Sequence, residues 1–118
     1  MAEWVPIQDG NFIAADVIRW KEWVYRPRRS RKARAIRLGD QLVTAEVIKE
    51  PDDKGWTRLL VRRCEILTEF SVKKLTPIYI GTEVKRSIRT IMRGQPERLL
   101  WSDESARAIV KSKFLGIR

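Results

Sequence analysis

The side chains best suited to a defined chemistry lie between Arg26 and Arg37. These twelve residues include seven basic side chains and no acid: Arg26, Arg28, Arg29, Arg31, Lys32, Arg34 and Arg37. The chain of 118 residues carries a net charge of +10, so removing these seven charges leaves +3 for the other 106 residues. Charge concentrated in one short segment is typical of a polyanion-binding surface, because each neutralised phosphate releases condensed counterions.

Six of these seven side chains are arginines. A guanidinium forms paired hydrogen bonds with phosphate or guanine and also stacks on bases. We therefore predict that residues 26–37, called the basic arm below, are the main contact with nucleic acid. A solvated loop, a targeting signal read by a transport receptor, and a patch for an acidic protein remain alternatives for the same residues.

An aromatic cluster directly precedes the basic arm and consists of Trp20, Trp23 and Tyr25. Aromatic rings beside cations are used for base stacking by proteins that bind single-stranded nucleic acid. Packing in the core is the stronger alternative, because large aromatic side chains dominate small cores. In a strand, Trp23 and Tyr25 would share one face and Trp20 would lie on the other.

Several chemistries are excluded by composition. The chain has no histidine and one cysteine, Cys64, so it cannot form a Ser-His-Asp or Cys-His site, a zinc finger or an intrachain disulfide. Helix capping explains the acidic run at residues 102–105 without catalysis. We expect no enzymatic activity, no cofactor and no metal site. Catalysis on nucleic acid through metal-bound carboxylates remains a distant third alternative, since no spacing of acids in the sequence stands out as a site. The single cysteine, together with the lack of a signal peptide or an apolar run of about 18 residues, predicts a cytoplasmic protein that does not enter membranes.

The elements that must position these residues begin with β-rich segments. Residues 17–25 are rich in β-branched and aromatic side chains and predict a strand, although a helical spacing competes. Pro27 and the repulsion between arginines predict a loop for the arm. Residues 42–48 and 56–66 predict a β-hairpin around the turn at residues 51–55, after a tight bend at residues 38–40. Alternation predicts that Val43, Ala45 and Val47 share one face of the first strand. It also predicts that Leu59 and Val61 share one face of the second.

The second half of the chain has helical patterns. Residues 82–93 predict a helix that ends at Gly94, with Lys85, Arg86, Arg89 and Arg93 clustered on one face as a second candidate contact with phosphates. A strand over residues 87–92 is the alternative. A final helix is predicted to begin at residues 102–104 and to end at Gly116. Its core-facing stripe would contain Ala106, Ile109, Val110 and Phe114.

Together these patterns predict one α+β domain over residues 1–118. Its architecture is a small SH3-like, partly open β-barrel or curled antiparallel sheet, with one or two short C-terminal helices. Residues 12–67 form the β-rich part and residues 76–118 the helical part. The β-rich part resembles SH3-like barrels, which include the KOW-type nucleic-acid modules. The glycines that flank the Lys-Gly step in KOW modules are missing around Lys54-Gly55, and the resemblance implies a fold more than a function.

The function expected from the sequence is binding of double-stranded DNA, chiefly through its phosphates. The basic arm is the principal contact, and Arg86, Arg89 and Arg93 form a second one. RNA binding is the nearest variant. A protein–protein adaptor, whose arm grips an acidic partner, is the alternative from a different class. If the protein binds DNA, a nucleoid association is expected.

Overall fold

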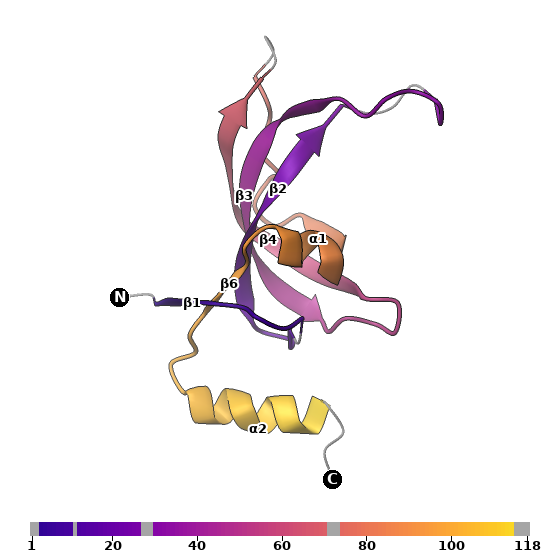
Figure 1. Cartoon of the computed structure of the whole chain (residues 1–118). Helices are drawn as coiled ribbons and strands as arrows, with labels where there is room; N and C mark the ends of the chain where they lie inside the picture. Colours follow the sequence, from indigo (N-terminus) through magenta and orange to yellow (C-terminus); the bar gives the residue numbers. More distant parts are fainter. Residues whose placement is uncertain (1–2, 11, 27–29, 71–73, 115–118) are drawn as a thin grey trace.

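Six strands form a single antiparallel sheet in the computed structural model, which describes residues 3–10, 12–26, 30–70 and 74–114. The strands lie in the order β1-β6-β2-β3-β4-β5. The elements in chain order are β1 (Trp4–Pro6), β2 (Val17–Tyr25), β3 (Arg37–Lys49), β4 (Trp56–Glu69), β5 (Glu83–Ser87), α1 (Ile88–Arg93), β6 (Glu97–Leu99) and α2 (Glu104–Phe114). Figure 1 shows β2, β3 and β4 as long twisted strands, with α2 set apart from them.

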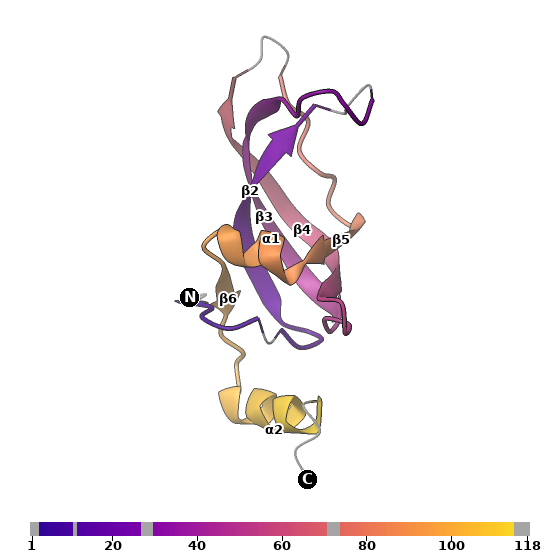
Figure 2. The same ribbon diagram turned by 45° about the vertical axis from the view of Figure 1, so that its right-hand side comes forward.

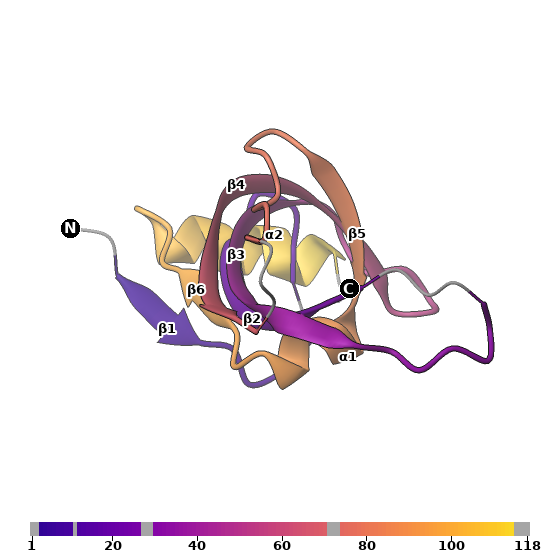
Figure 3. The ribbon, with the colours of Figure 1, turned by 90° about the horizontal axis from the view of Figure 1, so that it is seen from above.

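The sheet curls without closing. Seen from above, β4 and β5 bend round one side, and α1 lies near β2 (Figure 3). Figure 2 shows α1 in front of the long strands, where it connects β5 to β6. Strand β6 then returns to pair with β2 at Ile18 and Arg19. A curled antiparallel sheet with short C-terminal helices, one of the architectures expected from the sequence, is therefore confirmed.

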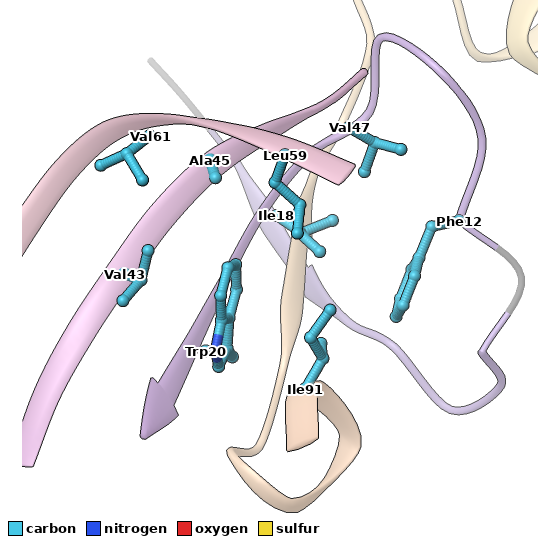
Figure 4. Packing of buried hydrophobic residues seen from close by; sticks show 9 residues of the cluster. All are labelled: Phe12, Ile18, Trp20, Val43, Ala45, Val47, Leu59, Val61 and Ile91. Atoms are coloured by element: carbon cyan, nitrogen blue, oxygen red, sulfur yellow. The ribbon is translucent and has the colours of Figure 1, made fainter. Parts of the chain in front are cut away.

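The core lies inside this curl. Strands β2, β3 and β4 send alternate side chains inward, because successive residues of a strand face opposite sides of the sheet. The alternation in β3 and β4 that the sequence predicted is confirmed. Helix α1 contributes one fully buried side chain, and the loop before β2 contributes another. The cluster, drawn in Figure 4, consists of Phe12, Ile18, Trp20, Val43, Ala45, Val47, Leu59, Val61 and Ile91.

Local sequence signals account for the strands and for the turn between β3 and β4. The predicted strand at residues 17–25 coincides with β2, and the predicted hairpin is formed by β3 and β4. The tight bend predicted at residues 38–40 is wrong, because β3 already begins at Arg37 and pairs there with β2. In the turn, Asp52 Oδ1 accepts hydrogen bonds from the backbone N–H groups of Lys54 and Trp56, each at 2.9 Å. Gly55 adopts a φ of +83°, which glycine tolerates because it has no Cβ.

The helix predicted over residues 82–93 is wrong in its first half. Residues 83–87 form β5, which pairs with β4 with Val84 opposite Leu59. The helix begins only at Ile88, where the Ser87 hydroxyl accepts the N–H of Thr90 and caps it. Pairing with a strand distant in sequence overrode a good helical pattern, since tertiary context outweighs local preference. The segment after residue 76 therefore contains two strands besides its helices.

Helix α2 lies where the sequence predicted a helix, but its apolar stripe does not face the core. Ile109 and Val110 are 59% and 42% exposed. The Phe114 side chain and the expected end at Gly116 lie outside the described residues. The helix is instead anchored by buried Arg107, whose Nε and Nη2 donate to Asp16 Oδ1 and Oδ2 at 2.8 and 2.7 Å. Within the described residues, neither helix has the long apolar stretch that crossing a bilayer requires.

Candidate nucleic-acid interface

The basic arm is the loop that joins β2 to β3. The N–H of Arg26 donates to the carbonyl of Ile36 at 2.9 Å, which closes the loop at its base. A turn within it places the N–H of Ala33 3.1 Å from the carbonyl of Ser30. Figure 1 shows the described part of this loop, residues 30–36, projecting from one end of the long strands. Of its predicted contact residues, Arg28 and Arg29 lie outside the described residues.

Most arginines of the framework have an acidic partner. Eight ion pairs occur among the described residues, and seven of their arginines lie outside the arm: Arg19, Arg58, Arg62, Arg63, Arg86, Arg98 and Arg107. In contrast, Arg26, Arg31, Lys32 and Arg34 are exposed, and none of them forms an ion pair within the described part of the chain. The described cations of the arm therefore carry positive charge that no acid among the described residues neutralises.

Arg37 differs from the rest of the arm, because it is the first residue of β3 and is held by its own chain. Its Nη2 donates to both carboxylate oxygens of Asp40 at 2.9 and 3.0 Å. The guanidinium lies over the ring of Trp23 and 5.0 Å from the ring centroid of Phe70. Arg37 therefore fixes the base of the arm and, among the described cations of the arm, is the least available for an external phosphate.

A groove of about 390 Å³ lies beside the base of the arm, between β2 and α1. We call it the aromatic groove. Strand β2 provides three side chains on one face, since Lys21, Trp23 and Tyr25 alternate with inward-facing residues. Helix α1 provides Thr90 and Arg93, and Arg86 reaches the groove from β5. Its lining is Lys21, Glu22, Trp23, Tyr25, Arg86, Thr90 and Arg93.

The floor of the groove is held rigid by Glu22. Its carboxylate accepts hydrogen bonds from Arg86 Nε and Nη2, both at 3.0 Å, and from Trp20 Nε1 and Gln41 Nε2, both at 2.8 Å. Burial alone would raise the pKa of Glu22, but the hydrogen bonds and charge of Arg86 outweigh it, so the pKa is lowered. The groove thus has three cations against one carboxylate, which is already neutralised by Arg86.

The pKa of Glu22 is lower in the folded protein than its ordinary value of 4.5. The ionised carboxylate therefore stabilises the fold fully above about pH 4.5. This stabilisation is lost as the pH falls through the folded-state pKa. We expect Glu22→Gln to lower the free energy of unfolding by about 1–3 kcal/mol at pH 7. The difference between wild type and variant, measured by urea unfolding, should shrink below pH 4.5. A difference that stays constant down to pH 3 would contradict this role.

The structure brings together only some of the residues that the sequence singled out. Trp23 and Tyr25 are 47% and 53% exposed and line the groove. Trp20 is completely buried and offers no ring face to a ligand. Of the four basic residues expected on one helical face, Arg86 and Arg93 line the groove, whereas Arg89 is exposed outside it. Lys85, on the outer face of β5, lies 5.5 Å from the ring centroid of Trp56.

Sequence reasoning missed Lys21, Glu22 and Thr90 as groove residues. The alternation of β2 was sufficient to find Lys21, which lies on the same face as Trp23 and Tyr25. Nothing local identifies Thr90, because its position depends on how α1 packs against β2. No cluster of three or more potential metal ligands occurs among the described residues. No family model, curated protein or solved structure matches this chain.

Proposed function

We propose that this protein binds double-stranded DNA, chiefly through the phosphates, with the basic arm as its principal contact. The observation that carries this proposal is the distribution of ion pairs. Acidic partners neutralise seven arginines of the framework, while the exposed cations of the arm have none among the described residues. A surface of this kind attracts a polyanion, because binding releases the counterions condensed on the phosphates.

The strand connections support an SH3-like relationship as part of the proposal. Strands β2, β3, β4 and β5 follow one another as neighbours, and a single short helix precedes β6, which returns to β2. This strand order supports the proposal of an SH3-like barrel left open, with β1 added at the edge beyond β6. Since such barrels host many functions, the argument for DNA depends on the arm and not on the fold. A nucleoid location follows from the proposal.

A protein–protein adaptor is the second candidate, and exposed apolar side chains favour it. Tyr79 and Ile80, just before β5, are 77% and 76% exposed. In an adaptor, the basic arm would bind an acidic protein partner. Co-purification with one stoichiometric protein and no nucleic acid would support the adaptor. Binding of duplex RNA as tightly as duplex DNA would shift the proposal to RNA.

The test is the salt dependence of binding to a random 20-base-pair duplex. We expect the affinity of the wild type to fall steeply between about 50 and 200 mM salt. In Arg31→Gln/Arg34→Gln, the slope of log affinity against log salt should become shallower by up to about 1.8, since each lost phosphate contact removes about 0.9. Fluorescence anisotropy at several salt concentrations measures both quantities.

The matched control is Lys49→Gln/Lys54→Gln, which removes the same charge from exposed residues near the β3–β4 turn. It should leave the slope nearly unchanged, because these lysines lie at the other end of the long strands from the arm (Figure 1). Equal slopes for the two double variants would show that net charge, and not the arm, attracts DNA. Binding that is independent of salt in the wild type would overturn the proposal.

A further inference from the structure

We infer that the aromatic groove receives an unpaired nucleobase, so that the protein prefers DNA in which a duplex adjoins a single strand. This inference rests on the proposed function, which brings DNA to the arm, and adds a second contact of different chemistry. The arm accounts for attraction to phosphates. It does not account for two exposed aromatic rings in the groove at its base.

The aromatic rings are placed for contact with a base. Trp23 and Tyr25 lie two residues apart on the same face of β2, and each has about half of its surface exposed. The guanidinium of Arg37 covers part of Trp23, yet the indole still lines the groove. Aromatic side chains left exposed beside cations are the stacking surfaces of proteins that bind single strands.

The charges of the groove fit the phosphate that accompanies such a base. Lys21 and Arg93 are exposed and form no ion pair within the described residues. Arg86 is bound to Glu22 and cancels its charge, so the groove presents the two unpaired cations beside the two rings. A volume of about 390 Å³ is within the range of sites for small ligands and matches a nucleotide better than a double helix.

The position of the groove relates it to the arm. Tyr25 lines the groove and the next residue, Arg26, begins the arm. A duplex held by the arm therefore passes the mouth of the groove. Its paired bases are stacked inside the helix and cannot enter, because a base must leave the stack before a protein pocket can hold it. A base beyond the end of the duplex has no such barrier.

The experiment compares three DNAs at constant salt: a blunt duplex, the same duplex with a three-nucleotide overhang, and the duplex with three abasic sugars as overhang. The last two carry the same phosphates and differ only in bases. For the wild type, we expect the overhang with bases to bind roughly 5- to 100-fold more tightly than the abasic one. Equal affinities for these two would overturn the inference.

Single substitutions test which aromatic ring is responsible for the preference for an overhang with bases. Trp23→Ala should remove most of the preference for bases, and Trp23→Phe, which keeps a ring beneath Arg37, should retain part of it. Tyr25→Ala is a second test that does not disturb the contact with Arg37. Trp56→Ala, which removes another exposed tryptophan, is the matched control and should keep the full preference. Loss of the preference in Trp56→Ala alone would place the stacking site elsewhere.

Failure of the inference and failure of the proposed function give different results. If the arm does not bind DNA, the blunt duplex shows neither affinity nor salt dependence. If the arm binds and the groove holds no base, the blunt duplex binds with a steep salt dependence and the two overhangs are equivalent.

Discussion

In Asp16→Ala, helix α2 is expected to detach from the sheet, and the free energy of unfolding is expected to fall by about 3–5 kcal/mol. Asp16 is completely buried, and its carboxylate accepts both hydrogen bonds of Arg107. It also accepts the indole N–H of Trp101 at 2.9 Å and the backbone N–H of Ile13 at 3.2 Å. Removing the carboxylate leaves these buried donors without a partner.

The pair with Arg107 is the main link between α2 and the sheet, since Ile109 and Val110 face solvent. Hydrogen bonds from Arg107 to Asp16 raise the pKa of the guanidinium, so the guanidinium stays charged. Arg107→Ala should therefore cost about as much as Asp16→Ala. The double variant should cost clearly less than the sum, because most of each single effect is an uncompensated buried group.

Urea unfolding measures the stability change, and hydrogen exchange of α2 measures its release. The control is Glu83→Gln, which weakens the exposed ion pair between Glu83 of β5 and Arg58 of β4. Exposed pairs contribute about 0–1 kcal/mol, so this variant should remain close to wild type. If Asp16→Ala costs no more than Glu83→Gln, the buried pair does not anchor α2.

The second large effect is expected in Gly94→Ala. A Cβ at this position would overlap the carbonyl oxygen of Lys21 and lie 2.8 Å from its backbone nitrogen. Both obstacles are backbone atoms, which cannot rotate away. The hydrogen bond from the Lys21 N–H to the Gly94 carbonyl, 2.9 Å long, would also be lost. Overpacking and this lost bond together should lower the free energy of unfolding by about 2–4 kcal/mol.

Gly94→Ala should also separate α1 from β2 and widen the aromatic groove. We expect the preference for an overhang with bases to be lost while the arm still binds the blunt duplex. Gly10→Ala is the control, because its Cβ would meet mainly the side chain of Ile88, which can move. Thermal unfolding ranks the two variants. A Gly94→Ala protein as stable as Gly10→Ala would mean that β2 and the end of α1 are not in such close contact.

Local patterns were sufficient for part of the fold. The alternation of residues 43, 45 and 47 predicted the inner face of β3, and residues 51–55 predicted the turn before β4. Gly94 was predicted as the end of a helix, and α1 does end there. The sequence did not show that the backbone of β2 lies too close to Gly94 to leave room for a Cβ. The helical pattern of residues 83–87 failed because β4 supplies their hydrogen-bond partners, and a pattern within one segment contains no information about its neighbour.

The prediction that the apolar side chains of α2 face the core failed for a related reason. Ala106, Ile109 and Val110 have the spacing of a buried face, but burial depends on what surface lies opposite. The helix is oriented by Arg107 and Asp16, whose positions are 91 residues apart. From the sequence alone, a charged residue in an amphipathic helix is expected to face solvent. Arg107 was therefore not identified as the side chain that anchors the helix.

The sequence by itself determined where the positive charge is concentrated, because seven basic residues in twelve positions remain together in any fold. It also determined the strands of the central hairpin, whose alternation is a local property. Only the tertiary structure decided which arginines remain unpaired. Arg19, Arg86 and Arg107 meet acids 64 to 91 residues away, and such partners follow from strand order and not from spacing. The aromatic groove likewise exists only where α1 packs beside β2, because that contact brings together side chains from three separate elements.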